Sequence, residues 1–569
     1  MPGENTLPLV TQIEIKIDGS DLANDIMDKL AEVEIETSLY LPSMFILRFY
    51  DDDLALLDGA KFKEGKSVEI KMPNTANVLT PIIKGEITAI EPDFAQDSIA
   101  NLVVRGYDRS HRLHRGMKSK VFVNVTDGDI VTQIASKSGL SATVDATPGI
   151  HEHVFQYGVS DWAFIHERAR RNGFEVRVDD KTLYFQQASK TSGTLTLAWN
   201  AELVRFQPRF SLAKQVEKVT VKGWDPKNKQ AIIGQASSSS SSPATGLSGW
   251  GGSLAQSAFS SSAEVLEVRH PVASQGEATD MAQAILDEIN AGFLQADGIA
   301  LGNPALQPGV KVTIQKVGTK FSGTYIVTTA RHIYNPTDGY RTYFTVQGAR
   351  AQTIADLIDQ SMIEQRNTQL WGGIVTAIVT NNNDPENMAR IKVKFPWLDD
   401  TLESGWARVS SISAGNQRGF LWLPEVNDEV LVAFEHGDFD YPYIVGAVWN
   451  GKDAMPEATS AAVSNGKVVV RTLKTTAGHI IRLTDTSGGE KIEIIGAKTS
   501  SKITLDEAGK KISLESGGDI ELTATGNLTL KGASIKVDAD QTFEASAKTS
   551  AKVESNGTLD LKGSVVNIN

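Results

Sequence analysis

Several side chains in this sequence are of types that support metal binding or catalysis, and their spacing decides which chemistry is open to them. His151-Glu152-His153 offers two metal ligands, but it lacks the His-Glu-x-x-His helical spacing and an obvious third ligand. Asp428, Glu429, Glu435 and His436 bring carboxylates near a histidine, as acid–base chemistry requires. These four residues fall within a strand–turn pattern, so structural roles are favoured for both groups.

Nucleophilic and phosphate-binding motifs are also incomplete. Ser411 and Ser413 lie in no Gly-x-Ser-x-Gly elbow, and Gly249–Gly252 has no strand–loop–helix context. The absence of cysteine removes thiolate nucleophiles, thiolate zinc sites and disulfides. We therefore predict that the chain is not an enzyme and uses no cofactor or metal.

Composition and charge narrow the possible partners. The chain has 569 residues, a formal net charge of −13 and 41% hydrophobic residues. An acidic balance argues against nucleic acid as a ligand, because nucleic-acid binding needs clustered Lys and Arg. The start, Met1 to Val10, has no signal-peptide pattern, and no run is long enough for a membrane span. We expect a protein made in the bacterial cytoplasm without a signal peptide.

The elements that must position any site are predicted to be mainly strands. The segments are a first β-barrel (1–120), an α/β insertion (121–200), a second barrel (201–350) with a flexible Ser/Gly-rich insertion (235–262), a linker helix (351–370), a small OB-type barrel (371–451), a linker (452–470) and a rod of stacked strands (471–569).

The two barrel segments share short motifs in the same order. Lys63–Ile70 parallels Gln307–Ile314, and Lys84-Gly85-Glu86 parallels Ser322-Gly323-Thr324. We interpret the two segments as copies of one barrel, with chance similarity between barrel strands as the alternative.

Caps and apolar spacing predict a few helices between these strands. The predicted helices are Asp129–Ser138, Asp161–Asn172 with Ser160 as its cap, Gln275–Ala291 ending at Gly292, and Ile354–Gln365 in the linker.

The last hundred residues repeat an apolar–polar–apolar triplet about every eight residues, loosening to about eleven upstream. Each strand buries only one face, and a repeat this short becomes stable only by stacking. The predicted core of the rod consists of its inward apolar pairs, which are Ile512, Leu514, Ile520, Leu522, Leu528, Leu530, Ile535, Val537, Leu559 and Leu561.

The segment from residue 373 onward resembles a known family. Gly373–Thr376, Asn383-Asp384-Pro385, Arg390–Trp397 and Pro424–Asp438 are similar to the VgrG spike proteins, which resemble the hub and spike proteins of contractile phage tails. Val221–Pro226 and Phe321–Tyr325 resemble the phage tail-hub branch and favour an extracellular, phage-like system. Ala389 departs from the family, which has Gly before the Arg.

This resemblance implies a homotrimer with tandem tail-hub barrels, an OB-fold collar and a triple-stranded β-helix. It implies a puncturing spike at the tip of the inner tube of a contractile injection system. The implied partners are the inner tube, baseplate and hub proteins, a PAAR-like tip protein and the target cell envelope, and they include no nucleic acid. The location implied is a phage tail-like particle, either released or membrane-anchored. A type VI secretion VgrG or a phage tail spike is the nearest alternative.

The end of the rod and the linker before it give further expectations. A blunt rod exposes unpaired strand edges, so we predict that a tip protein docks on Val566, Asn567, Ile568 and Asn569. The 20-residue gap before the rod is too short for a catalytic domain, and the chain stops at Asn569. The remote alternatives are a β-helix enzyme acting on polysaccharides, which the scarcity of aromatic residues in the rod argues against, and an adhesin.

Overall fold

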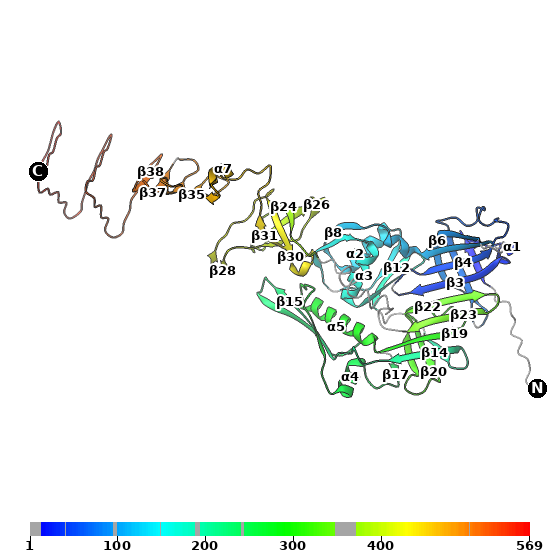
Figure 1. Ribbon diagram of the computed structural model, residues 1–569. Coiled ribbons are helices and arrows are strands. Elements are labelled where there is room, and N and C mark those ends of the chain that lie inside the picture. Colours follow the sequence, from blue (N-terminus) through cyan, green and yellow to red (C-terminus); the bar gives the residue numbers. More distant parts are fainter. Residues whose placement is uncertain are drawn as a thin grey trace, which may run out of the picture. The chain divides into compact units, whose positions relative to one another are not determined.

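The structure is a computed structural model, and it describes residues 13–39, 41–74, 76–94, 100–147, 149–187, 194–240, 244–346, 371–499 and 501–568. The chain forms two compact units, Met1–Asn450 and Gly451–Asn569 (Figure 1). In the described part, no helix is both long and apolar enough to cross a membrane. The predicted linker helix at 354–365 lies outside the described residues.

An eleven-stranded sheet runs through both predicted barrels, in the order β14-β19-β23-β22-β3-β4-β7-β6-β5-β1-β2. Its strands are β1 (Glu14–Ile17), β2 (Ser20–Asp21), β3 (Leu30–Ser38), β4 (Met44–Tyr50), β5 (Ser67–Pro73), β6 (Leu79–Phe94), β7 (Ala100–Asp108), β14 (Leu203–Phe210), β19 (Leu294–Leu301), β22 (Thr329–Asn335) and β23 (Gly339–Val346), with the short helix α1 (Asn24–Met27) between β2 and β3.

The two barrels repeat one pairing order. The series β3-β4-β7-β6 in the first barrel corresponds to β14-β19-β23-β22 in the second. The first strand of each series carries a β-bulge at the same place, between Leu30 and Glu32 in β3 and between Leu203 and Arg205 in β14. This repeated order supports the interpretation of the two segments as copies.

Strands β3 and β22 join the two barrels in one antiparallel ladder, and His332 lies in that joint without exposure to solvent. Its Nδ1 lies 2.7 Å from the Tyr340 hydroxyl and its Nε2 lies 3.1 Å from the Leu306 carbonyl oxygen. A neutral imidazole satisfies both contacts, with Nε2 donating to Leu306 and Nδ1 accepting from Tyr340. Burial lowers the pKa of His332 to about 3, although the bond to Leu306 opposes this shift.

We expect the hub to lose stability on acidification because of His332. His332 binds a proton near pH 6.5 in the unfolded chain but only near pH 3 in the folded chain. The free energy of unfolding therefore decreases as the pH falls from about 6.5 to about 3. Between pH 7 and 4.5 the parent should lose about 2 kcal/mol more than His332→Gln, measured by urea unfolding of the hub. Equal losses in the two proteins would rule out His332 as the cause.

The α/β insertion combines two small sheets with two capped helices. It contains a 3₁₀ turn η1 (Arg109–His114), β8 (Lys118–Val125), α2 (Asp127–Lys137), β9 (Ser141–Val144), β10 (His151–Val159), α3 (Asp161–Asn172), β11 (Phe174–Asp179) and β12 (Thr182–Gln187). Helix α3 begins and ends as predicted, with Ser160 accepting from the Ala163 N–H and Gly173 left-handed at the end. Helix α2 starts two residues earlier than predicted, because Thr126 and Asp129 form a capping box.

The second barrel is completed by peripheral strands and by helix α5, which has the predicted bounds. These elements are β13 (Thr194–Ala198), β15 (Lys218–Asp225), β16 (Gln230–Ala236), β17 (Ala244–Thr245), α4 (Gly251–Phe259), β18 (Glu264–Glu267), α5 (Gln275–Ala291), β20 (Lys311–Gln315) and β21 (Gly323–Ile326).

The prediction of a flexible insertion at 235–262 is wrong for the residues that form β17 and α4. The serine-rich composition gave no sign that the backbone of this segment packs closely against another part of the chain at a glycine. A Cβ on Gly252 would lie 2.2 Å from the Val216 carbonyl oxygen, so Gly252 lets α4 pack against the preceding segment.

The OB domain is a closed five-stranded barrel, since β24, β30, β31, β27 and β25 pair in turn and β24 also pairs with β25. Its elements are β24 (Val375–Asn381), β25 (Arg390–Phe395), β26 (Asp399–Glu403), β27 (Ala407–Val409), β28 (Ala414–Gly415), β29 (Arg418–Gly419), β30 (Glu429–Phe434), η2 (Glu435–Gly437) and β31 (Pro442–Ala447). Phe420–Pro424 forms no strand and is a largely exposed segment after the β28–β29 hairpin.

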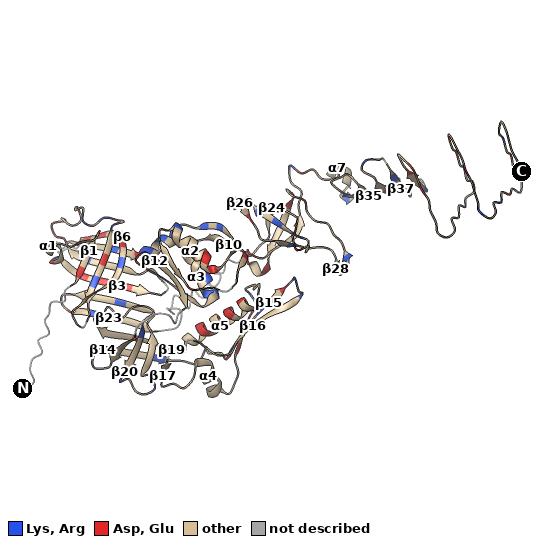
Figure 2. Cartoon of the chain, turned by 180° about the vertical axis from the view of Figure 1, so that it is seen from behind, with Lys and Arg blue, Asp and Glu red and all other residues tan. Residues whose placement is uncertain are grey.

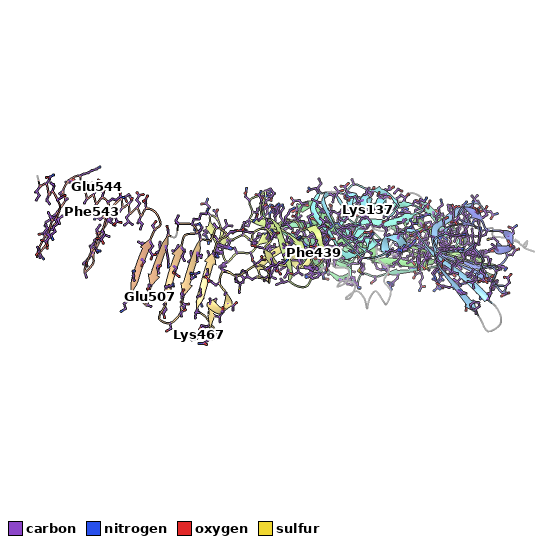
Figure 3. The ribbon with its side chains drawn as sticks, turned by 90° about the horizontal axis from the view of Figure 1, so that it is seen from above. Lys137, Phe439, Lys467, Glu507, Phe543 and Glu544 are labelled. Atoms are coloured by element: carbon purple, nitrogen blue, oxygen red, sulfur yellow. The ribbon has the colours of Figure 1, made fainter. Side chains whose placement is uncertain are left out.

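The second unit begins with α7 (Thr459–Ala462) and the hairpin β32 (Val463–Ser464) and β33 (Lys467–Val468). A five-stranded antiparallel sheet follows, made of β34 (Val470–Lys474), β35 (Ile480–Thr484), β36 (Lys491–Ile495), β37 (Lys502–Asp506) and β38 (Lys511–Glu515). Each strand pairs with the next along the chain (Figure 3).

Candidate functional sites in the rod and the collar

The rod sheet has one apolar face that this chain leaves open. Ile481 pairs with Ile494 and Leu483 pairs with Ile492, so apolar residues form rows that cross the strands. The next ladders extend these rows through Ile503 to Leu514. Seven apolar side chains on this face are exposed, from 38% at Ile503 to 72% at Ile512, although such side chains are normally buried.

The opposite face of the same sheet is polar and is covered by its own side chains. Glu493 is only 2% exposed, and it pairs with Lys502 at 2.7 Å and Lys491 at 3.3 Å. Burial would raise the pKa of the Glu493 carboxyl, but bonds to these two lysines outweigh it and lower the pKa. The Arg482 Nε donates to Glu457 at 2.9 Å on the same face. Ion pairs and hydrogen bonds within one chain thus cover most of the polar face, although the buried Thr504 hydroxyl has no hydrogen-bond partner among the described residues, whereas the apolar face is left uncovered.

Beyond β38 the alternating pattern continues, but residues 516–568 form no strand with any described part of this chain (Figure 3). The ten apolar residues predicted as the rod's core are 54–72% exposed. At the predicted docking end, Val566 is 49% and Ile568 83% exposed, Asn567 is exposed, and Asn569 lies outside the described residues. The single chain thus brings none of these residues together, and their roles stay predictions.

An aromatic cluster joins the hub insertion to the OB barrel within the first unit. Phe155 and Tyr157 of β10 lie 4.8 Å and 5.0 Å, between ring centroids, from Phe439 of the OB domain. Tyr157 also meets the edge of Trp371. Phe155 is buried in the same core as the barrel strands, so β10 serves as part of the collar's wall. The sequence signal for this role was the aromatic–polar–aromatic alternation Phe155-Gln156-Tyr157, which we did not predict to be a strand.

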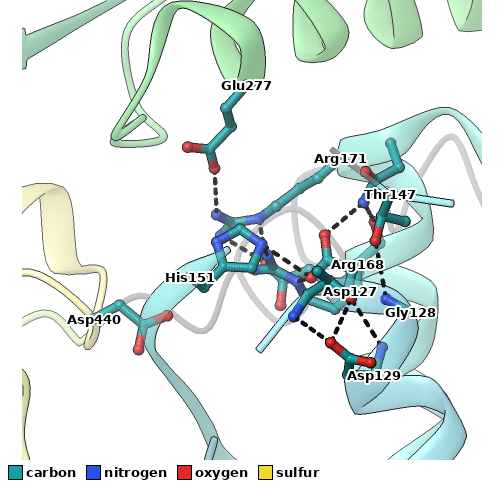
Figure 4. Close-up of polar contacts among 12 residues, drawn as sticks. Asp127, Gly128, Asp129, Thr147, His151, Arg168, Arg171, Glu277 and Asp440 are labelled. Atoms are coloured by element: carbon teal, nitrogen blue, oxygen red, sulfur yellow. Dashed lines mark hydrogen bonds and ion pairs between the residues drawn. The ribbon is translucent and has the colours of Figure 1, made fainter. Parts of the chain in front are cut away.

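Charged groups beside this cluster connect three segments of the first unit (Figure 4). Arg171 of α3 lies 4.0 Å from Glu277 of α5 and 3.5 Å from Asp438 of the OB domain. Asp440 accepts a hydrogen bond from the Phe155 N–H at 2.7 Å. Burial raises the pKa of Asp438, whereas the Arg171 charge opposes that rise. These contacts attach the OB domain to the hub, although the residues that make them are far apart in the sequence.

The innermost ion pair of this region joins Asp127 to Arg168. Both residues are at most 3% exposed, and the Arg168 Nε donates to the Asp127 carboxylate. Asn172 donates to the other carboxylate oxygen at 2.7 Å. Burial alone would raise the pKa of Asp127, but the Arg168 charge and the contact with His151 hold it well below its usual range.

The residues considered for chemistry take structural roles. The two histidines contact residues of the hub and the OB domain: His151 Nε2 lies 2.9 Å from Arg168, and His153 Nε2 lies 2.9 Å from the Glu403 carbonyl oxygen. Glu435 accepts from the Tyr443 hydroxyl, and Asp428 accepts from the Glu425 N–H. In the part of the chain that the structure covers, no group of three or more His, Asp or Glu could hold a metal ion.

Ala389 adopts a left-handed conformation, with φ of 59°, directly before Arg390. This conformation costs a residue with a side chain about 1–2 kcal/mol, a cost that glycine escapes. We expect Ala389→Gly to stabilise the OB domain by about 1 kcal/mol in thermal or urea unfolding. The control Ala447→Gly, in a strand, should instead lose about 0.5–1 kcal/mol. A loss at Ala389→Gly would show that the turn is not strained.

Comparison with known protein families gives two matches within the first unit. The family described as the Alg8 N-terminal domain matches residues 8–335, more than half of the chain. The family described as the type VI secretion system/phage-baseplate injector OB domain matches residues 375–449.

Curated relatives match over shorter stretches. The type VI secretion system spike protein VgrG1a of Pseudomonas aeruginosa is 28% identical over 180 residues, which are 29% of this chain and 28% of VgrG1a. The actin cross-linking toxin VgrG1 of Vibrio cholerae is 32% identical over 101 residues, which are 16% of this chain and 9% of the toxin. The chain therefore matches about a quarter of the first relative's length and less of the second.

The fold is shared with a chain of a solved PdpA-VgrG complex. In the lidded PdpA-VgrG complex of Francisella, one chain is similar with a TM-score of 0.53 and 10% identity, covering 89% of this chain and 79% of that one. With both family matches and the spike relatives taken together, this chain belongs to the family of the Alg8 N-terminal domain and is a spike protein of the VgrG type.

Proposed function

We propose that this protein is the trimeric puncturing spike of a contractile injection system, with the rod completed by two further copies of the same chain. The carrying observation is the apolar face of residues 470–515, which continues as an alternating pattern to residue 568 without a strand partner in the described part of this chain. A face of this kind has to be covered, and identical chains offer identical faces.

A trimer would both cover the apolar face of the rod and provide strand partners for the residues beyond 516. The three apolar faces would meet on one axis, while the three polar faces, with Glu493 paired to Lys491 and Lys502, would lie on the outside. Beyond residue 516 the strands would find their hydrogen-bond partners in neighbouring chains. Such intertwining gives stiffness, because no strand leaves without breaking ladders to other chains. A stiff rod transmits force from a tube to a target envelope.

The collar and hub would connect the rod to the inner tube. The partly buried contacts of Arg171 with Glu277 and Asp438 would hold the collar rigidly on the hub while load passes through it. The hub would seat on the inner tube and contact baseplate proteins. Two barrel copies in each of three chains would match a sixfold tube.

We further propose that a PAAR-like tip protein binds at Val566–Asn569, where Val566 and Ile568 are exposed apolar residues. Pull-down of a tip protein by the trimer should be lost when Lys562–Asn569 is deleted. Binding that survives this deletion would place the tip protein elsewhere.

The type of injection system and the catalytic status are parts of the same proposal. We infer a phage tail-like particle assembled from a cytoplasmic chain, and the similarity to VgrG1a supports a type VI secretion spike as the second candidate. The matched residues are those of spike proteins and the potential catalytic groups are held in structural contacts, so we propose a role without catalysis.

Light scattering of the full-length protein tests this function. We expect three times the 61.5 kDa chain mass, and a band of that size should survive unheated SDS. A monomer would contradict the proposed spike and would favour a rod that folds on itself, as in the β-helix enzyme or adhesin alternatives.

A further inference from the structure

Two strand edges of the hub have no partner among the described residues. Strand β14 pairs only with β19, so it ends the sheet. Strand β6 bends, so that its residues up to Glu86 pair with β5 while those from Ala89 to Phe94 pair only with β7. An unpaired strand edge is a template for another strand.

The repeated pairing order shows what the two edges correspond to. β14 is the counterpart of β3, and the second half of β6 is the counterpart of β22. Within the chain, β3 and β22 are already joined as an antiparallel ladder. The open edges of β14 and β6 therefore correspond to the two strands that already pair with each other as β3 and β22.

The register of this second joint follows from equivalent residues. Phe94 and Tyr334 each pair with the residue six positions further on, Ala100 and Tyr340, so they are equivalent. The shared bulge makes Phe206 equivalent to Val33. Tyr334 lies opposite Val33 and Arg331 lies opposite Glu36 within the chain. The same spacing sets Phe94 opposite Phe206, Glu91 opposite Arg209 and Ala89 opposite Ser211.

Charges on the four edges are segregated by sign (Figure 2). β3 carries Glu32, Glu34 and Glu36 without a basic residue, and the Arg331 of β22 forms an ion pair with Glu34. The second joint reverses these signs: β14 carries Arg205 and Arg209, and the second half of β6 carries Glu91 and Asp93.

We propose that neighbouring chains of the trimer join through a β6–β14 ladder with Glu91 opposite Arg209, and that the opposite charges of these two open edges select this pairing. The proposal rests on the trimer proposed above. β3 and β22 already pair with each other within each chain, so the alternatives are pairings of like edges. Pairing of β6 with β6 of another chain would oppose two acidic edges, and pairing of β14 with β14 would oppose two basic ones. Directly opposed like charges destabilise a sheet, so only alternation of first and second barrels remains.

The backbone of β14 explains why side-chain charges, rather than backbone hydrogen bonds alone, determine which strand pairs with this edge. Ser211 N–H donates to the Phe293 carbonyl of the strand on the paired side. Residues alternate, so the backbone of Pro208 faces the open edge and offers no N–H there. The edge is thus a poor template for a foreign strand, and the opposite charges of Arg209 and Glu91 favour the correct one.

A disulfide reporter tests the ladder, because the chain has no cysteine of its own. Ala89→Cys with Ser211→Cys places the two thiols in directly opposed positions of neighbouring chains, close enough for a disulfide. We expect most of the full-length protein to run as covalent trimers after mild oxidation. The control, Ala89→Cys with Ser38→Cys, should stay unlinked, since β3 is occupied by β22.

Charge reversal tests the selection in the same reporter. Glu91→Arg with Asp93→Arg should reduce cross-linking at least fivefold, and adding Arg205→Glu with Arg209→Glu should restore it. A trimer by light scattering without cross-links in the first reporter overturns the ladder and leaves the spike function standing. Cross-links unaffected by the reversal overturn the selection by charge. A monomer overturns both proposals.

Discussion

Leu530→Asp is expected to abolish the SDS-resistant trimer. Leu530 is 66% exposed in the single chain, but in the proposed rod its side chain lies on the axis against two symmetry copies. The substitution would bury three carboxylates together, and each costs on the order of several kcal/mol without a partner. Native gels and light scattering of the full-length protein would measure the loss.

The matched control is Thr529→Asp, one residue earlier in the same triplet. Successive side chains point to opposite faces of a strand, so this carboxylate should face water and leave the trimer intact. Equal behaviour of the two variants would show that the alternation does not distinguish an inside from an outside, and the rod's core would have to be reassigned.

Arg168→Ala should destabilise the hub by about 3–5 kcal/mol, because it leaves the Asp127 carboxylate buried without its cation. The tryptophan fluorescence of the hub, which contains the buried Trp162, would follow the shift of the urea midpoint. The exposed Arg115, changed to Ala, should alter stability by less than about 0.5 kcal/mol.

The double variant Asp127→Asn with Arg168→Met separates loss of the pair from loss of one partner. It removes both charges at similar volume, so it should cost less than Arg168→Ala alone. If the double variant were the less stable protein, the charges themselves would contribute net stability at this site.

Local signals predicted helices α3 and α5 and the first rod triplets well. Ser160 and Gly173 mark the ends of α3, and the triplets at Ile492, Ile503 and Ile512 fall within β36, β37 and β38. Caps and period-two patterns act within a few residues, so they can be seen without the fold.

Long-range features escaped prediction for physical reasons. β3 alternates Glu32, Glu34 and Glu36 with buried Val33 and Ile35, and it was not identified as the strand that joins the barrels. The acidic row has a role only once β22 lies beside it, and β22 is nearly 300 residues away in the sequence.

The hub–collar joint shows the same limit. His153 pairs with a carbonyl 250 residues away, and Phe155 bonds to Asp440 across 285 residues. No spacing rule connects such partners, so two histidines that resemble a metal pair in the sequence are in fact structural contacts. The predicted rod core and docking residues are local in sequence, but their proposed partners belong to other chains.

Hydrogen–deuterium exchange of residues 520–568 in the full-length protein tests the central claim most directly. These residues form no strand with the described part of their own chain, so a rod of single chains would exchange its amides within seconds. We predict protection along the whole segment, because the amides would be bonded to neighbouring chains. Rapid exchange throughout, in a protein that is otherwise folded, would contradict the intertwined spike.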